Sequence, residues 1–224
     1  MSYWKNYWNT VADNTSQLMQ VQRDAISDSQ MFLIEKHICS VLNLHPEDAL
    51  LDVCCGNGML TRRLARHCKQ VVGVDFSEKL ISLAQKETEV VNVSFIEEDA
   101  TQLSRSLNFK FDKILLYFSF QYLNTSQGAL VISEMKSLLK PGGKILIGDI
   151  PDKKKFWVYY DSFFKRFFYF KQWLFRRPKM GKFWSENELN TLAAKNYFQG
   201  KYLIQDAALP HAHYRFDYVM TFDK

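Results

Sequence analysis

Small and acidic residues follow the first of several short apolar runs in this sequence. Residues 52–58 read Asp-Val-Cys-Cys-Gly-Asn-Gly. Gly56 and Gly58 carry no side chain, so the backbone can approach a ligand closely there. The helix predicted to follow begins with unpaired backbone amides, which can bind a carboxylate or a phosphate. A glycine pair alone is equally typical of a structural tight turn.

Acidic residues follow the next two apolar runs. Asp75 ends the second run, where a carboxylate can accept hydrogen bonds from both hydroxyls of a ribose. Asp99 follows the third run, where it could accept a hydrogen bond from an adenine amino group. Either acid alone also fits a helix cap or an acidic turn. Three such motifs, each at the end of an apolar run and in this order, indicate a ligand-binding site far more specifically than any one of them.

Strand-like and helix-like segments must position these residues, and they alternate from residue 30 to 150. The predicted strands are 49–53, 70–74, 91–96, 113–117 and 144–148, and the predicted helices are 31–44, 59–67, 78–86 and 128–139. A further helix opens at Ser185, and strands follow at 201–205 and 216–222. Such alternation predicts a mostly parallel, doubly wound α/β sheet that binds ligands beyond its strand ends.

Together these motifs resemble those of the class I S-adenosylmethionine (SAM) dependent methyltransferases over residues 45–150. Residues 51–58 are similar to the glycine-rich first motif, Asp75 to the ribose-binding acid and Asp99-Ala100 to the adenine-binding pair. Residues 111–117 resemble the fourth motif, and residues 138–143 (LLKPGG) the turn into the fifth strand. The resemblance implies a Rossmann-like, seven-stranded sheet with an antiparallel last strand, SAM as cofactor and S-adenosylhomocysteine as product.

Two residues depart from the family's pattern. The family more often has Gly where Cys54 stands, although the Cys-Cys pair is similar to that of quinone-pathway methyltransferases. Gln121 occupies a place that is often His in small-molecule members, so a His base is not available there. Residues 56–61 (GNGMLT) lack the third glycine of a dinucleotide site, and no ATPase phosphate-binding loop is present.

The predicted site residues fall into three groups. The cofactor group is Asp52, Cys54, Cys55, Gly56, Asn57, Gly58, Asp75, Phe76, Asp99, Ala100, Tyr117, Tyr3 and Trp8. The acceptor group is Gln121, Tyr122, Tyr160 and Phe164, and His211 and His213 are candidates for a base or an acceptor contact. Histidines beside a Pro turn are also common on surfaces. No metal is predicted, because the four cysteines lack metal-ligand spacing.

The chain is expected to be one domain, with a core at 45–150 and additions on either side. Residues 1–44 form a helical cap, in which an aromatic segment either folds over SAM or simply docks on the core. Residues 151–184 form a lid inserted after the fifth strand, and 185–224 a helix and two strands. Residues 153–182 hold ten Lys or Arg and one acid, in a chain of net charge +5.

The lid is predicted to be helical, with distinct apolar and basic sides. Its apolar side is Phe156, Tyr160, Phe163, Phe167, Phe170 and Leu174, and Lys155, Lys165 and Arg166 lie on the other. The basic side is either a solvated surface or a contact with an anionic or lipid-linked acceptor or a membrane surface. RNA is a third reading, disfavoured because no recognised RNA-binding module accompanies the basic residues.

The expected function is methyl transfer from SAM to oxygen or nitrogen of a small molecule or of a glycan- or lipid-linked metabolite. The alternatives are a SAM-binding protein without catalysis and an RNA methyltransferase. The N-terminal residues lack an apolar signal core, and no uncharged run is apolar enough to span a bilayer. We therefore expect a cytoplasmic protein, with or without peripheral membrane contact.

Overall fold

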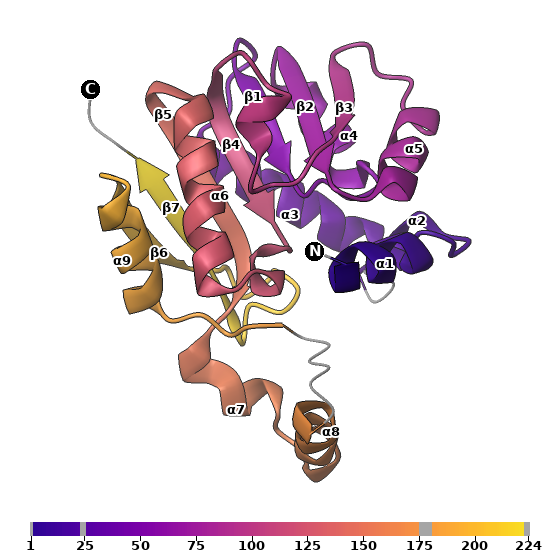
Figure 1. Ribbon diagram of the computed structural model, residues 1–224, viewed down its shortest axis with the longest axis vertical. Helices are drawn as coiled ribbons and strands as arrows, with labels where there is room; N and C mark the ends of the chain where they lie inside the picture. Colours follow the sequence, from indigo (N-terminus) through magenta and orange to yellow (C-terminus); the bar gives the residue numbers. More distant parts are fainter. Residues whose placement is uncertain (1, 23–25, 175–180, 222–224) are drawn as a thin grey trace.

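The computed structural model describes residues 2–22, 26–174 and 181–221, and a seven-stranded sheet forms its centre (Figure 1). The strands are β1 (Ala49–Val53), β2 (Gln70–Asp75), β3 (Val93–Glu97), β4 (Phe111–Tyr117), β5 (Leu139–Pro151), β6 (Gln199–Ile204) and β7 (Arg215–Thr221). Their order is β3-β2-β1-β4-β5-β7-β6, and β7 runs antiparallel to β5 and β6. The predicted mostly parallel, doubly wound sheet is confirmed.

Helices cover both faces of this sheet. They are α1 (Ser2–Val11), α2 (Gln17–Gln20), α3 (Asp28–Leu42), α4 (Met59–Leu64), α5 (Glu78–Lys86), α6 (Thr125–Leu138), α7 (Phe156–Tyr159), α8 (Phe163–Leu174) and α9 (Glu186–Lys195). Successive strand residues point to opposite faces. In β1, Leu51 packs in the cluster that includes α6 and α9, whereas Leu50 packs in the cluster of α3 and α4.

Several element boundaries differ from the predictions, and three of the differences have a clear physical reason. β3 begins at Val93, because Val91 is fully exposed and buries nothing. α6 begins at Thr125, where Asn124 and Gln127 form a capping box that starts the helix earlier than its apolar pattern does. β5 includes the predicted break at 140–143, since Leu139 pairs with Phe111 before a register shift and Gly142 adopts a φ of +73°.

The predicted continuous apolar side of the lid is wrong. Tyr160, with φ −89° and ψ 54°, ends α7, and the chain changes direction before α8 begins. Phe156 and Tyr160 pack with Phe183, whereas Phe163, Phe167 and Phe170 lie exposed on α8. The side chain of Leu174 lies outside the described residues. Within the described residues no helix is long and apolar enough to cross a membrane.

Candidate functional site

A cavity opens at the carboxyl ends of the central strands, where the strand order reverses between β1 and β4. Its volume is about 1300 Å³, including space open to solvent at its mouth. The lining residues are Tyr3, Trp4, Trp8, Val21, Met31, Asp52, Cys54, Cys55, Gly56, Asn57, Met59, Leu60, Asp75, Phe76, Leu80, Asp99, Ala100, Thr101, Tyr117, Phe118, Ser119, Tyr122, Leu123 and Gln127. Every residue of the predicted cofactor group except Gly58 is among them.

Unusual backbone conformations shape the cavity at the ends of both central strands. After β1, Cys54, Gly56 and Gly58 have φ values of +61°, +59° and +72°, so the chain turns back sharply. Directly after β4, Phe118 has a φ of +68°. Bulky residues rarely adopt this left-handed conformation, and when they do it is often at a binding site. Gly58 contributes by packing, because a Cβ there would lie 2.4 Å from the Phe95 ring.

Two buried carboxylates lie side by side at the ends of β1 and β2. Asp75 accepts hydrogen bonds from the backbone N–H of Gly56 at 3.0 Å and of Ser77 at 2.9 Å. Asp52 accepts one from the Thr61 hydroxyl at 2.6 Å. Burial raises the pKa of Asp75 to about 6 and that of Asp52 to about 7, the latter with a contribution from the charge of Asp75. A bound cation would relieve this cost and favour the ionised forms.

A third carboxylate follows β3. Oδ1 of Asp99 accepts hydrogen bonds from both the backbone N–H and the hydroxyl of Thr101, each at 2.8 Å. The backbone N–H of Asp99 donates to the Glu98 side chain at 2.8 Å. These local bonds hold the loop so that Asp99 and Ala100 both line the cavity.

The cysteine pair adds an apolar surface to the cavity. Burial, together with the negative charges of Asp75 and Asp52, raises the pKa of both the Cys54 and the Cys55 thiol well above the ordinary value. A thiol reacts as its thiolate, so neither group is poised as a nucleophile. The pair therefore contributes shape and contact area.

Aromatic rings from the N-terminal segment form the opposite wall. The Tyr122 ring, which follows β4, lies 4.6 Å from the Trp4 ring and 5.5 Å from the Trp8 ring. Tyr3 lines the cavity beside them. The aromatic faces are electron-rich and attract cations.

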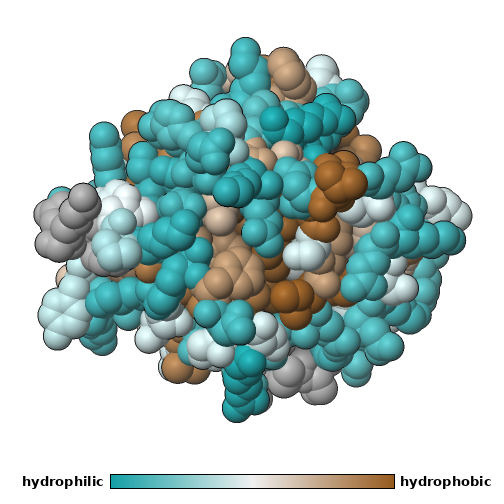
Figure 2. All heavy atoms as spheres, turned by 90° about the horizontal axis from the view of Figure 1, so that it is seen from above, coloured by the Kyte–Doolittle hydropathy of each residue, from teal (hydrophilic) through white to brown (hydrophobic). Residues whose placement is uncertain are grey.

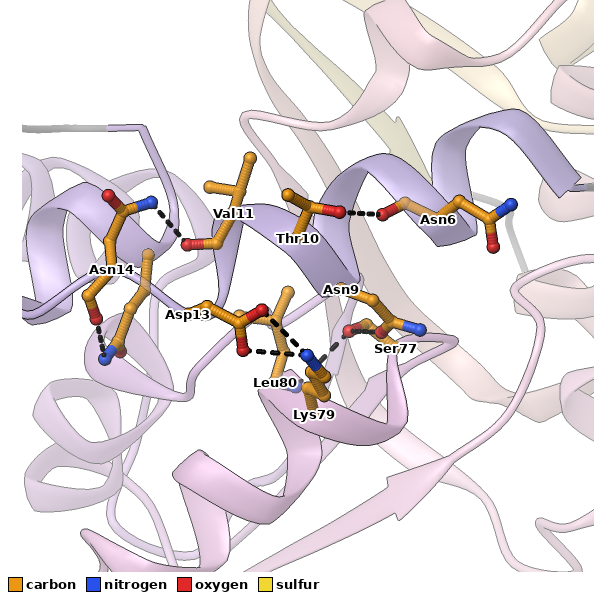
Figure 3. A network of polar contacts seen from close by, with 10 residues as sticks. Asn6, Asn9, Thr10, Val11, Asp13, Asn14, Ser77, Lys79 and Leu80 are labelled. Carbon is orange, nitrogen blue, oxygen red and sulfur yellow. Dashed lines mark hydrogen bonds and ion pairs between the residues drawn. The ribbon is translucent and has the colours of Figure 1, made fainter.

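Polar contacts hold this N-terminal segment over the strand ends (Figure 3). The Ser77 hydroxyl donates to Asn9 at 2.6 Å, and the Lys79 ammonium contacts both carboxylate oxygens of Asp13 at 2.7 and 2.8 Å. On the other side, the Asn57 amide donates to the backbone carbonyl of Gln17 at 2.8 Å. The Lys79–Asp13 pair is exposed to water, so its loss costs little energy.

The predicted acceptor residues are dispersed. Tyr122 lines the cavity, but Gln121 is buried behind it, where its carbonyl accepts the backbone N–H of Lys182 at 2.7 Å. Tyr160 packs in an aromatic cluster, and Phe164 lies 75% exposed on α8. His211 and His213 are not among the described residues that line the cavity, and their rings lie 5.7 and 4.8 Å from that of Tyr214. Their roles stay predictions.

Several lining residues were not predicted from the sequence. Phe118 and Ser119 directly follow the predicted fourth strand, at the same place relative to a strand as Asp99, so their position at the ligand-binding edge was predictable. Met31, Leu60 and Leu80 reach the cavity from helices, and no local pattern distinguishes them from core residues.

A buried ion pair that no local sequence pattern indicates lies near Tyr122. The Arg215 guanidinium, at the start of β7, contacts the Asp149 carboxylate at the end of β5 at 2.9 Å. The Asp149 backbone N–H donates to the carboxylate of Asp217 at 2.7 Å. His37, on α3, contacts the other oxygen of the Asp217 carboxylate. This network joins two strands and a helix.

Comparisons with known proteins agree with this geometry. A family profile described as a methyltransferase domain matches residues 50–143. The chain is 32% identical over 146 residues to the demethylmenaquinone methyltransferase of Staphylococcus epidermidis, covering 63% of this chain and 59% of that protein. It is 33% identical over 112 residues to the ubiquinone biosynthesis O-methyltransferase of Coxiella burnetii, covering 49% and 47%. The chain thus spans about half to three-fifths of these relatives.

Solved structures share the fold at lower identity. The magnesium protoporphyrin IX methyltransferase from Synechocystis with bound SAM has a TM-score of 0.62 at 18% identity, covering 98% of this chain and 92% of that chain. The N-methyltransferase NodS from Bradyrhizobium japonicum in complex with S-adenosyl-L-homocysteine has a TM-score of 0.67 at 17% identity, covering 98% of both chains. Together with the match of residues 50–143 to a methyltransferase domain and the strand-end motifs, these structures show that the chain has the fold of SAM-dependent methyltransferases.

Proposed function

We propose that this protein transfers the methyl group of SAM to a small molecule. The observation that carries the proposal is the charge of the cavity. Asp52, Asp75 and Asp99 line it, and none of the described lining residues is Lys, Arg or His. A phosphate-rich cofactor would be repelled, whereas a ligand that carries a sulfonium and an ammonium group would compensate the buried carboxylates.

The lining residues also match the parts of SAM. Asp75 would bind the ribose hydroxyls with the lone pairs that its two backbone donors leave, and Asp99 would accept from the adenine amino group. The turn at Gly56 would hold the methionine portion, with Asp52 near its ammonium group. SAM supplies an already activated methyl group, so the main task of the protein is to hold the acceptor in line with that methyl.

The acceptor would enter beside Tyr117, Phe118 and Tyr122, which present aromatic surface at the end of β4. This surface suits a partly apolar acceptor, and the relatives' names refer to demethylmenaquinone and to ubiquinone biosynthesis. We further propose that the methyl group is transferred to an oxygen or nitrogen atom and that the acceptor can be linked to a lipid or a glycan. The basic residues of 153–182 support an anionic or membrane-bound acceptor.

A general base is needed only for an acceptor atom that holds its proton tightly. His211 and His213 remain the candidates, and their use would require the loop between β6 and β7 to move toward the cavity. A cytoplasmic location is part of the same proposal.

The test is to incubate the protein with methyl-labelled SAM and a cell extract separated into small-molecule, lipid, glycan and nucleic-acid fractions. Asp75→Ala serves as the impaired variant, and Glu89→Gln, at an exposed position before β3, as its matched control. Label in the small-molecule, lipid or glycan fraction that Asp75→Ala abolishes would support the proposal. Label in RNA would replace it with RNA methylation. SAM binding without any transfer would favour a non-catalytic protein.

A further inference from the structure

Helix α8 exposes more large aromatic side chains than any other described helix or strand. Its exposed rings are Phe163 (79%), Phe164 (75%), Phe167 (59%), Phe168 (56%) and Phe170 (60%). Five large apolar side chains in one helix form a continuous patch of the kind that marks an interaction site. Figure 2 shows the end of the molecule away from α8, where the surface is mostly hydrophilic with apolar side chains in smaller groups.

The attachment of α8 fixes the direction of this patch. Tyr169 is the one half-buried residue among 163–171, and its ring lies 5.1 Å from Phe156 and 5.0 Å from Tyr160. With 3.6 residues per turn, the five exposed phenylalanines span an arc of roughly 160°, and Tyr169 lies opposite the middle of that arc. The aromatic face of α8 therefore lies opposite the contacts that anchor the helix, and α8 itself lies beyond α7 at one end of the molecule (Figure 1).

Positive charge surrounds the aromatic face. Lys165 and Arg166 flank Tyr169 on either side of α8, and Lys171 lies within the aromatic arc. Lys153 and Lys154, which precede α7, are also exposed. Asp161 is the one acid in residues 153–182, and it pairs with Lys165 at 3.0 Å.

We infer that α8 docks on an anionic lipid bilayer, with its phenylalanines inserted at the level of the headgroups. Exposed aromatic rings combined with lysine and arginine are the chemistry by which interfacial helices bind such surfaces. A second copy of this chain is a poorer occupant, because pairing two α8 faces would bring like charges together. Closure of α8 over its own cavity would require the helix to rotate away from its Tyr169 contacts.

Docking in this way would bring the cavity close to the membrane. The insertion leaves the sheet at Pro151 and returns at Trp184, whose backbone N–H donates to the Pro151 carbonyl at 2.9 Å. Lys182 contacts the backbone of Gln121, next to Tyr122 in the cavity wall. A lipid-linked acceptor would thus have a short path from the bilayer to the rim of the cavity.

The test is sedimentation of the full chain with vesicles of phosphatidylcholine, alone or mixed with phosphatidylglycerol, in the absence of SAM. We expect binding to the anionic vesicles that weakens as salt is added. Phe163→Ser combined with Phe167→Ser should weaken binding roughly ten-fold or more, because two insertable rings are lost. Phe32→Ser is the matched control, since Phe32 is 52% exposed on α3 and should leave binding unchanged.

A second pair of variants tests the charge. Lys153→Glu combined with Lys171→Glu should weaken binding to anionic vesicles by at least roughly ten-fold, whereas Lys195→Glu combined with Lys201→Glu, at exposed positions of α9 and β6, should have little effect. All four positions are exposed, so the thermal unfolding curves should be unchanged.

Three outcomes would overturn the inference. They are no binding of the wild-type protein to anionic vesicles at low salt, binding that the phenylalanine variants leave intact, and a dimer that those variants dissociate. The readout is independent of methyl transfer, so failure here and failure of the proposed function are distinguishable.

Discussion

The backbone N–H of Gly56 donates to the carboxylate of Asp75 over 3.0 Å, which ties the turn after β1 to the end of β2. The other oxygen of Asp75 accepts from Ser77 at the start of α5. A single side chain thus orders the glycine turn while it faces the cavity. Its loss affects both the shape of the site and the contacts offered to a ligand.

We expect Asp75→Ala to weaken SAM binding by about 1–3 kcal/mol, because paired hydrogen bonds to a carboxylate are lost in a buried site. Isothermal titration calorimetry measures the change, and the unfolding free energy without SAM separates it from damage to the turn. Glu89→Gln, at an exposed position before β3, should bind SAM as the wild type does. Wild-type affinity in Asp75→Ala would remove this residue from the cofactor site.

SAM affinity should rise with pH between about pH 5 and pH 8. The pKa values of Asp75 and Asp52 are about 6 and 7, and a cationic ligand binds best when both carboxylates are ionised. Titrations at several pH values would measure the slope, and Asp52→Asn should flatten its upper part. A pH-independent affinity would contradict a role for these charges.

The same pKa values predict the opposite trend for the protein without ligand. Because both folded-state values lie above the ordinary value of 3.8, the folded state holds protons that the unfolded state has already released. The free energy of unfolding should therefore fall as pH rises from about 4 to about 7. Denaturant unfolding of the wild type and of Asp52→Asn would show it, and the variant should lose part of the dependence.

Substitutions in the glycine turn should differ in sign. At Cys54, with a φ of +61°, Gly removes backbone strain, so Cys54→Gly should keep stability within about 1 kcal/mol of the wild type or raise it. Gly58→Ala adds a Cβ at a φ of +72° and 2.4 Å from Phe95, so it should destabilise by about 1–3 kcal/mol. Thermal unfolding compares the two, and equal losses would refute this account of the turn.

Release of the N-terminal segment should control the dissociation of SAM. Lys79→Ala removes an exposed ion pair with Asp13, worth about 0–1 kcal/mol, and should accelerate SAM dissociation by up to roughly five-fold (Figure 3). Stopped-flow tryptophan fluorescence reports the rate, since Trp4 and Trp8 line the cavity. Lys154→Ala, which removes an exposed pair with Glu186, is the control and should leave the rate unchanged.

The buried pair of Asp149 and Arg215 should behave as a unit. Removal of one partner leaves an uncompensated buried charge, so Arg215→Met and Asp149→Asn should each destabilise by about 3–5 kcal/mol. The double variant should lose less than the sum of the two. Chemical unfolding of all four proteins completes the cycle, and strictly additive losses would show that the pair is not coupled.

The cavity lining at the carboxyl ends of β1, β2 and β3 was largely predictable from the sequence. Parallel strands bring their carboxyl ends to one edge, so Asp75 and Asp99 could be placed once the apolar runs were recognised as strands. Phe118 occupies the equivalent position after β4, but a phenylalanine carries no charge or hydrogen-bonding group that would distinguish it from a core residue. Arg215 and Asp149 meet through the antiparallel pairing of β5 and β7, which leaves no local trace in the sequence.

The lid was less predictable, for a physical reason. Helical periodicity shows which side chains share a side, but not where the backbone leaves the helical region, as it does at Tyr160. Periodicity also does not show what covers an apolar side. Phe156 is covered by Phe183, whereas Phe163 and Phe167 are covered by nothing in the described part of the chain.

The insertion that contains α7 and α8 enters and leaves the sheet through adjacent residues, since Asp152 and Trp184 form a parallel bridge and Lys153 donates to the Trp184 carbonyl at 2.8 Å. Because its two ends are bonded to each other, the insertion could be replaced without disturbing the sheet. A different segment could be joined at the same two positions while the strands that carry Asp52, Asp75 and Asp99 keep their register. Selection could then change the acceptor without re-optimising the half of the protein that binds the methyl donor.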